Sequence, residues 1–331
     1  MGPLTFRERL REASAAGRPL LLDAAMGTEL ARRGVDTSPP LWSARGLERD
    51  THLVREIHLE NARAGADVLT ANTFRTHARN LCAAGGPRHA RPGARELTRT
   101  AVALAREAAA ASGRSGILVA GSLAPLEDCY TPALVPEDDS LAREHAAQAT
   151  ALAETGCDLI LVETMNAARE ALAAARAAAA TGLSVAVSMV TDGAGLLLSG
   201  DSLAETAKAL LALPAPPDLL AVNCVPARSI GADLARLRAA APGVPLGVYA
   251  NTGRALDEAR GIFTEPTPPE DYARLAASWL AGGGVALLGS CCGTTSAHTL
   301  ALRTLIDGTG QGGQRGGGPV VGGANPAIPT T

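Results

Sequence analysis

Eight short apolar runs alternate with alanine-rich segments along the chain, and this alternation limits the folds that the sequence can adopt. Each run is rich in Val, Leu and Ile and has the length of one strand, whereas the segments between them have a helical period. Strands that are apolar on both faces belong to parallel sheets covered by helices. We therefore predict strands at Pro19–Ala24, Asp67–Asn72, Gly116–Ser122, Asp158–Thr164, Leu183–Met189, Asp218–Cys224, Pro245–Asn251 and Val285–Cys291.

Eight strand–helix units over about 290 residues match the size and rhythm of a (β/α)8 TIM barrel. An open, doubly wound sheet is the alternative, but the even spacing and the lack of a composition break favour a single barrel domain. We expect an N-terminal helix within residues 1–17, the barrel over 18–307 and a disordered Gly/Pro-rich tail over 308–331. The clearest predicted helices are Leu141–Glu154, Ala167–Ala180, Ala204–Leu213, Ala232–Ala241 and Glu270–Ala281.

Charge and composition exclude several classes of partner. The 30 basic and 33 acidic residues leave a net charge of −3, which gives no electrostatic footprint for nucleic acid or an anionic membrane. We find no signal-peptide pattern and no apolar stretch of membrane length. A GxGxxG match at residues 308–313 lacks the preceding strand and following helix of a dinucleotide site. We expect a soluble, cytoplasmic protein with reduced cysteines, and the sequence does not define its oligomeric state.

Polar side chains follow the predicted strands at their carboxyl ends, where TIM barrels place their chemistry. Glu163, after the fourth strand, can pair with an ammonium group or can be a structural carboxylate satisfied by backbone donors, and we favour the first role. We expect Asn72 and Asn251 to contact substrate, and Asn223 to support a metal centre through hydrogen bonds. Asp23 is either a substrate ligand or a turn former. The same rim also contains Thr73, Ser122 and Tyr249.

Three of the six cysteines also end predicted strands at this rim. Cys224 ends the sixth strand, and Cys291 and Cys292 end the eighth. Because alternate strands contribute side chains to the same layer of a barrel interior, the three thiols can meet at one point. Three protein ligands with an open fourth position form the pattern of a catalytic Zn²⁺ site. Buried thiols or a redox pair are the alternatives, and we favour zinc.

The other cysteines and one histidine are given no function by the sequence. We expect Cys157 at the opposite end of the barrel as a small buried residue. Cys82 and Cys129 fall in predicted loops, and we assign them no role. We expect His298 at a solvated helix position and not as a metal ligand.

Several segments of the chain resemble blocks of the homocysteine S-methyltransferase family. GSCCGTT (Gly289–Thr295) resembles its GGCCGT signature, VNC (Val222–Cys224) its upstream cysteine motif, and LLLDAAMGTEL (Leu20–Leu30) its opening DGAMGT strand. The blocks follow the family's order from residue 20 to about residue 305. The resemblance implies a zinc-dependent barrel that transfers a methyl group to the sulfur of homocysteine and forms methionine. Further similar blocks are AGADVLTANTFRT (Ala64–Thr76), DLILVETM (Asp158–Met165) and PLGVYANTG (Pro245–Gly253).

The resemblance also implies roles for individual residues. Cys224, Cys291 and Cys292 would be the zinc ligands, and Glu163 would bind the amino group of homocysteine. The turn formed by Asp23, Ala24 and Ala25 would hold the amino-acid end of the substrate, partly through backbone N–H groups. The family usually has glycine at the position of Ala24, so alanine there would be costly if the position needs a positive φ.

The expected ligand set indicates the type of chemistry. Zinc ionises a coordinated thiol, and three thiolate ligands keep the metal centre electron-rich, which favours alkylation of a thiolate over activation of water. A zinc-dependent lyase or hydrolase is therefore disfavoured. The sequence is also compatible with a zinc- or thiol-binding sensor without methyl transfer, and with a methyltransferase acting on another thiol or selenol.

We find no folate, cobalamin or AdoMet-binding module beside the barrel, so donor and acceptor should meet at one rim. Aromatic faces there can bind a cationic methyl donor through cation–π contact or can simply anchor loops. Compact chains of this kind resemble the family members that use S-methylmethionine; AdoMet is the other donor we expect. Five of the eight aromatic residues lie near the predicted rim, namely Trp42, Phe74, Tyr130, Tyr249 and Phe263.

Overall fold

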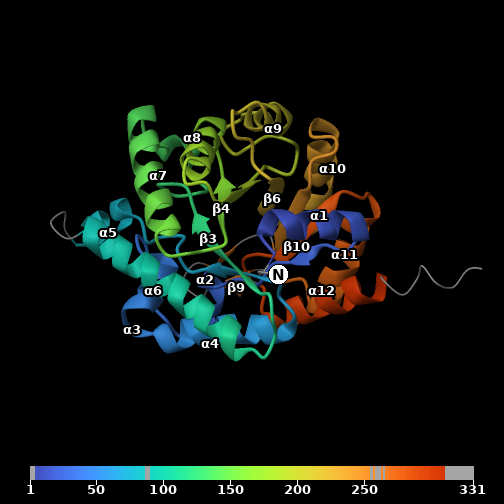
Figure 1. The fold of residues 1–331 in the computed structure, drawn as a ribbon, viewed down its shortest axis with the longest axis horizontal. Helices are drawn as coiled ribbons and strands as arrows, with labels where there is room; N and C mark the ends of the chain where they lie inside the picture. The colour runs from blue at the N-terminus through green and yellow to red at the C-terminus, as the bar shows by residue number, and fades with distance from the viewer. Residues whose placement is uncertain (1–3, 86–89, 254–255, 258–261, 264, 310–331) are drawn as a thin grey trace, which may run out of the picture.

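The computed structural model describes residues 4–85, 90–253, 256–257, 262–263 and 265–309 and shows a ring of helices around a central sheet (Figure 1). Eight parallel strands are hydrogen-bonded in the order β1-β10-β7-β6-β5-β4-β3-β2. A parallel bridge between Leu22 and Val68 joins the two outer strands and closes the barrel. This confirms the predicted (β/α)8 fold. The strands are β1 (Leu20–Leu21), β2 (Val68–Ala71), β3 (Leu118–Leu123), β4 (Leu159–Met165), β5 (Ser184–Met189), β6 (Leu219–Pro226), β7 (Leu246–Asn251) and β10 (Val285–Ser290).

Helices follow each barrel strand and cover its outer face, and the five helices predicted from the sequence agree with the structure to within three residues at either end. The loop after β7 also forms a short antiparallel pair, β8 (Leu256–Asp257) and β9 (Ile262–Phe263). The helices are α2 (Gly27–Arg32), the 3-10 helix η1 (Trp42–Arg45), α3 (Gly46–Arg49), α4 (Thr51–Ala64), α5 (Ala78–Gly85), α6 (Ala90–Ala111), the 3-10 helix η2 (Pro132–Leu134), α7 (Asp138–Ala153), α8 (Ala168–Ala179), α9 (Leu203–Leu211), α10 (Ile230–Ala240), α11 (Pro269–Ala281) and α12 (Ser296–Thr309).

Three aspartates form hydrogen bonds and ion pairs at the end of the barrel at which the strands begin. Each of three aspartates precedes a strand, and its carboxylate accepts a backbone N–H from the neighbouring strand. Each also pairs with at least one arginine, so the carboxylate is neutralised at the edge of the core. The bonds run from Leu21 to Asp67 at 3.0 Å, from Val119 to Asp158 at 2.6 Å and from Val185 to Asp218 at 3.1 Å, with Arg114, Arg106 and Arg7 among the ion-pair partners.

Helix α1 (Phe6–Ala16) lies against this same end, within the predicted N-terminal segment. Thr5 and Glu8 cap its first turn reciprocally, an arrangement that satisfies two otherwise unpaired N–H groups. Phe6 and Leu10 are buried and join the cluster of apolar side chains that fills the barrel interior. The N-terminal end of the barrel is therefore closed, which leaves the opposite end for a binding site.

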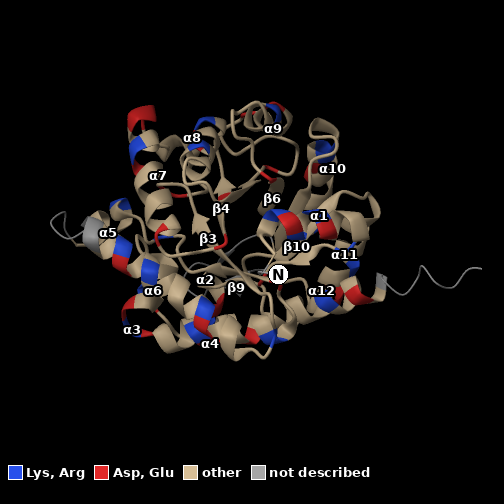
Figure 2. Ribbon diagram, in the orientation of Figure 1, with Lys and Arg blue, Asp and Glu red and all other residues tan. Residues whose placement is uncertain are grey.

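Charged residues lie mainly on the outer helices, and basic and acidic residues are interspersed in this view (Figure 2). None of the helices in the described residues has the length and apolar character needed to cross a membrane. The predicted tail lies almost entirely outside the described residues, since α12 runs to Thr309 and residues 310–331 are not described.

Tyr272 of α11 links strands β7 and β10 near their carboxyl ends through hydrogen bonds. Its buried hydroxyl lies 2.9 Å from Ala250 N, whose N–H it accepts, and 3.0 and 3.1 Å from the carbonyl oxygens of Ala250 and Gly289. We expect Tyr272→Phe to lower the free energy of unfolding by about 1–3 kcal/mol, because it leaves buried backbone groups unpaired. Urea unfolding measures the change. Ser278→Ala, at an exposed position of the same helix, should stay within about 0.5 kcal/mol; equal losses in both variants would contradict this role.

Candidate metal centre and active site

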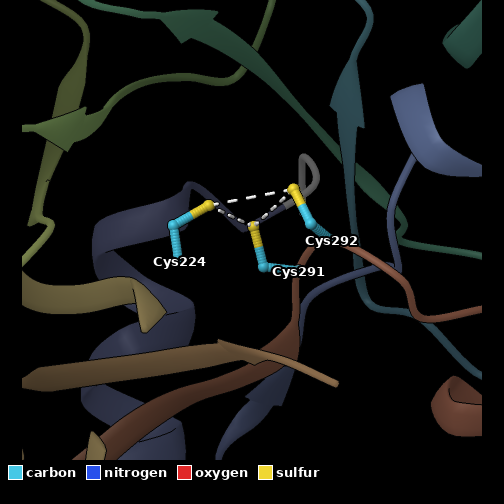
Figure 3. Close-up of side chains that lie close together, drawn as sticks. All are labelled: Cys224, Cys291 and Cys292. Carbon is cyan, nitrogen blue, oxygen red and sulfur yellow. Dashed lines mark hydrogen bonds between the residues drawn. The ribbon is translucent and has the colours of Figure 1, made fainter. Parts of the chain in front are cut away.

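Three cysteine sulfurs meet at the carboxyl end of the barrel and point toward one another (Figure 3). The Sγ of Cys224 lies 2.9 Å from the Sγ of Cys291 and 3.9 Å from that of Cys292, and the two neighbouring cysteines are 3.9 Å apart. Among the described residues, this is the only group of three or more metal-ligating side chains whose ligand atoms all lie within 4.8 Å of one another. The structure thus brings together the three residues expected to bind metal.

The cluster fits a thiophilic metal ion in its donor set and its size. Zn–S bonds of about 2.3 Å give a tetrahedron with sulfur–sulfur edges of about 3.8 Å, close to two of the three observed distances. The third pair, Cys224 and Cys291, would have to move apart by about 1 Å. All three cysteines are free thiols, and soft thiolate donors select zinc or similar metals over Mg²⁺ or Ca²⁺.

Hydrogen bonding within the cluster favours one thiolate. The thiols of Cys291 and Cys292 hydrogen-bond to the sulfur of Cys224 and hold its pKa well below the usual range. The same bonds raise the pKa of Cys291 and Cys292. The hydroxyl of Tyr130 also stabilises the Cys224 thiolate. The protein therefore offers a partly preformed anionic site to a cation.

The backbone departs from regular strand geometry at two points of this rim. Thr164 and Cys224 have φ values of 60° and 54°, in the left-handed region that is uncommon for residues other than glycine and an outlier for a β-branched residue such as Thr164. Each lies at an irregularity in strand pairing, β4 against β5 and β6 against β7. Such a conformation costs about 1–3 kcal/mol per residue and persists only where the surroundings hold it. The hydrophobic pattern of the sequence gives no signal for these irregularities.

A cavity of about 760 Å³ opens beside the cysteines. It is deep enough for an amino acid together with a second small molecule, in the size range of ordinary ligand sites. The cavity brings carboxylates, the three clustered thiols and four of the five predicted rim aromatics into one space. Its lining includes Asp23, Glu163, Cys224, Trp42, Phe74 and Tyr130.

Glu163 is a buried carboxyl group with its side chain directed into the barrel. Its Oε1 accepts a hydrogen bond from the Ser122 hydroxyl, and the Tyr249 hydroxyl lies 3.5 Å from its Oε2. Burial raises the pKa of Glu163 to about 8, against the effect of the Ser122 bond. Nearby negative charge at Cys224 and Asp23 raises it further. An ammonium group entering the cavity would reverse this shift, because an opposite charge favours the ionised carboxylate.

The turn after β1 differs in part from its expected role. Ala24 is not among the non-glycine residues for which the structure describes a positive φ, so the alanine causes no backbone strain. Its N–H already donates to Asn61 Oδ1 at 3.1 Å, and the Ala25 N–H donates to Thr294 Oγ1 at 3.2 Å. A substrate carboxylate would have to displace or share these bonds. Asp23 lines the cavity, and its Oδ2 accepts the Thr70 N–H at 2.9 Å.

The two predicted rim asparagines make different contacts. Asn72 lines the cavity, and its amide donates to the carbonyl oxygen of Ser43 at 2.8 Å. The Asn251 amide donates to the carbonyl oxygen of Cys224 at 3.0 Å, and Asn251 is not part of the cavity lining. Asn251 thus supports the metal site through the backbone of a cysteine. Direct contact of either residue with substrate stays a prediction.

The aromatic residues divide between the mouth and the interior of the cavity. Trp42 and Phe74 pack edge to face with ring centroids 5.5 Å apart, and the Arg75 guanidinium covers a face of Phe74 at 5.0 Å. The Trp42 ring lies directly over Gly27, where a Cβ atom would be only 2.3 Å from it. Tyr249 is buried beside Glu163. The side chain of Phe263 lies outside the described part of the structure.

The structure corrects two expectations, for His298 and Cys82, and adds a residue that sequence reasoning missed. His298 is buried and not solvated, because the start of α12 turns its ring against Tyr272, with centroids 5.6 Å apart. The His298 Nε2 donates to the Thr267 carbonyl oxygen at 3.1 Å. Cys129 is buried and lines the same cavity as the cysteine cluster. As predicted, Cys157 is a small buried residue. Cys82 is exposed and lies on helix α5, and not in a loop as expected, because its segment continues the helical turn begun at Ala78.

Fold and site together define a TIM barrel whose carboxyl end holds a cavity and a cluster of three cysteines that could bind a metal ion. Residues 20–306 match the homocysteine S-methyltransferase family, and the chain belongs to this family of methyltransferases. It is 28% identical to homocysteine S-methyltransferase 4 of Zea mays, covering 92% of this chain and 94% of that protein. Identity to the selenocysteine Se-methyltransferase of Brassica oleracea var. italica is 29%, over 91% and 92% of the two chains.

A solved structure supports the same assignment. The metallated form of the homocysteine methyltransferase MmuM from Escherichia coli superposes with a TM-score of 0.75. The two chains are 29% identical, and the match covers 89% of this chain and 99% of the E. coli chain. The likeness therefore extends over nearly the whole barrel and includes a relative solved in a metallated form.

Proposed function

We propose that this protein transfers a methyl group from S-methylmethionine or AdoMet to the thiolate of homocysteine and forms methionine, with Zn²⁺ at Cys224, Cys291 and Cys292. One observation carries the proposal: the three sulfurs share a cavity with the buried carboxylate of Glu163. To bind an amino acid with a thiol side chain, a site needs a metal for the thiol and a hydrogen-bond acceptor for the ammonium group. Reducing conditions, as in the cytoplasm, would keep the cysteines free for metal.

The metal would supply the reactive form of the acceptor. A free thiol has a pKa of about 8.5 and is mostly protonated at neutral pH. Zinc, when bound, ionises a coordinated thiol and so provides a thiolate nucleophile. The proton of the acceptor thiol leaves to solvent. The sulfur–methyl bond of the donor sulfonium then breaks as the new sulfur–methyl bond forms, so the positive charge is lost and a neutral thioether product departs.

The residues of the chain hold the two reactants in line. Glu163, oriented by Ser122 and Tyr249, and Asp23 would bind the ammonium group of the acceptor. Fixing the acceptor at both ends converts a bimolecular reaction into an effectively unimolecular one. The rings of Trp42 and Tyr130 would stabilise a cationic donor through cation–π contact. Carboxylates that line the same cavity, Asp36 and Asp128, add to the attraction for a cation.

A selenol is the second acceptor to consider, because the Brassica oleracea relative is named as a selenocysteine Se-methyltransferase. Selenols ionise more readily than thiols and would bind the same soft metal site. Both acceptors carry the ammonium group that Glu163 would bind. Acceptor choice would then depend on the distance between the metal site and the carboxylates.

A panel of donors and acceptors tests the proposal. Zinc-loaded protein would be assayed with S-methylmethionine, AdoMet or betaine as donor and with homocysteine or selenocysteine as acceptor. We expect methionine from homocysteine with a sulfonium donor and none with betaine. Stoichiometric zinc without methyl transfer from any donor would instead support the role of a sensor, and protein that binds no zinc when freshly reduced would overturn the proposed mechanism.

A further inference from the structure

One buried side chain joins the two strand ends that carry the site. Asn223 lies on β6 directly before Cys224 and is completely buried. Its Nδ2 donates to Thr164 Oγ1 at 2.9 Å, and its Oδ1 accepts the Thr164 N–H at 3.2 Å. The Ser188 hydroxyl donates to the same Oδ1 at 2.7 Å. Because Thr164 follows Glu163 on β4, Asn223 links the strand of the carboxylate to the strand of the cysteine.

Both strand ends joined in this way contain a backbone conformation that needs outside support. Thr164 and Cys224 both have left-handed φ values at irregularities in strand pairing. Residues in such conformations stay there only when surrounding contacts hold them. Asn223 bonds both the N–H and the hydroxyl of Thr164, so it fixes the backbone and the side chain of that residue together. The positions of Glu163 and Cys224 relative to each other therefore depend on this bridge.

We propose that Asn223 is a positioning residue that sets the spacing between the carboxylate and the metal site and thereby selects the length of the acceptor. This inference rests on the proposed function, in which the acceptor is held by its ammonium group at Glu163 and by its sulfur at the metal. Cysteine is shorter than homocysteine by one methylene group, so it cannot satisfy both contacts at the same spacing. A loosened spacing would reduce the penalty for the shorter molecule.

Asn251 provides a matched comparison on the other side of Cys224. Its amide donates to the Cys224 carbonyl oxygen from β7, and none of its described hydrogen bonds reaches β4. Asn251 therefore supports the ligand without linking it to the carboxylate. Loss of Asn251 should weaken metal binding alone, whereas loss of Asn223 should weaken metal binding and also relax acceptor selection.

The test uses the full chain, with metal removed and replaced by Co²⁺, whose bonds to thiolates give absorption bands. Five variants would be compared: Asn223→Ala, Thr164→Val, Thr164→Ser, Asn251→Ala and the control Asn166→Ala. Titration with Co²⁺ alone gives metal affinity. Titration of the Co²⁺ protein with homocysteine or with cysteine, without donor, gives the Kd of each acceptor from the change in the bands. Asn166 is a buried asparagine after β4 whose amide donates to the Asp128 carbonyl oxygen, and none of its described hydrogen bonds reaches β6.

We expect Asn223→Ala and Asn251→Ala to bind Co²⁺ about 10–100-fold more weakly, as is typical when support of a metal ligand is lost. The preference for homocysteine over cysteine should fall at least about 10-fold in Asn223→Ala and in Thr164→Val, because imprecise positioning of about 1 Å costs about this much or more. Thr164→Ser keeps the hydroxyl and should retain the preference. Asn251→Ala and Asn166→Ala should also retain it.

An unchanged homocysteine preference in Asn223→Ala and Thr164→Val would overturn the spacing role. If Asn223→Ala does not fold, Thr164→Val decides, because valine keeps the shape of threonine and removes only the hydroxyl. Failure of the proposed function appears separately, as absence of methyl transfer by the wild type with every donor. The acceptor Kd values are measured without donor, so the two failures are distinguishable.

Discussion

Replacing Cys224 with alanine should abolish stoichiometric zinc binding and lower the rate of methyl transfer by about 10³-fold or more. Cys224 is the ligand supplied by β6, and the remaining two come from adjacent positions after β10. Two thiolates leave the metal with half a tetrahedral site. Without metal, the acceptor thiol stays largely protonated and the stabilisation worth several kcal/mol that a metal ion provides is lost.

Metal content after exhaustive reduction and the rate of methionine formation measure this effect. Cys82→Ala is the matched control, because Cys82 is an exposed cysteine on α5 and its loss should change neither quantity. Retention of one zinc ion per chain and of normal activity in Cys224→Ala would show that the ligand set is wrong.

Glu163→Gln should change stability and activity in opposite directions. The folded protein holds the pKa of Glu163 at about 8, above its ordinary value near 4.5. Between these values the folded chain keeps a proton that the unfolded chain has lost, so the free energy of unfolding falls as pH rises through this window. Above pH 8 the full cost of the buried charge is present. Glutamine removes it, and we expect a gain of about 2–4 kcal/mol in metal-free protein at pH 9.

Activity should fall because glutamine cannot neutralise the ammonium group of the acceptor. Removal of one partner from a buried ion pair costs about 3–5 kcal/mol, which corresponds to a loss of about 10²–10³-fold or more in kcat/KM for homocysteine. Binding of the donor should change little. The variant would therefore be a more stable and less active protein.

Denaturant unfolding of metal-free wild type and variant at pH 6 and pH 9 measures the first effect. The advantage of Glu163→Gln should be larger at pH 9. Glu29→Gln offers a control of opposite sign, because Glu29 is a buried carboxylate that pairs with Arg32 and Arg33, and its replacement should destabilise the fold. A Glu163→Gln variant that is less stable than the wild type at pH 9 would contradict the buried-charge argument.

The barrel itself was predictable because its strands are buried on both faces. Runs such as residues 159–162 are apolar at every position, and a helix-covered parallel sheet buries such a strand on both faces. The meeting of Cys224 with Cys291 and Cys292 followed from the same pattern, since side chains of the sixth and eighth barrel strands enter the same layer. The order of the strands, and the rule that alternate strands share a layer, therefore predicted that the three cysteines would lie together.

Features that depend on contacts between distant segments were not predictable. The left-handed backbone of Thr164 and Cys224 depends on hydrogen bonds from Asn223 and Asn251, which a local pattern does not reveal. Cys129 enters the cavity from a loop without periodicity. The expectation of a solvated His298 is wrong because this residue lies in the first turn of α12, where too few helical residues precede it for a periodic pattern to show which face it occupies.

The hydrogen bonds already made by the N–H groups of Ala24 and Ala25 were not predictable for the same reason. Their partners, Asn61 and Thr294, come from α4 and from the loop after β10, far away in the sequence. A prediction from the turn alone treats these donors as available. The structure shows that neighbouring side chains already bind them, so substrate recognition at this turn competes with internal bonds.

The ion pairs at the closed end of the barrel have a practical consequence for redesign. Arg18, just before β1, lies 2.7 Å from Asp307 near the end of α12, on the face away from the cavity. A circular permutant that keeps α1, whose Phe6 and Leu10 are buried, could link the end of α12 to the start of α1 and open the chain in another connection on that face. Such a rearrangement would leave each cavity residue on its own strand, so new domains could be attached without obstructing the entry of small molecules.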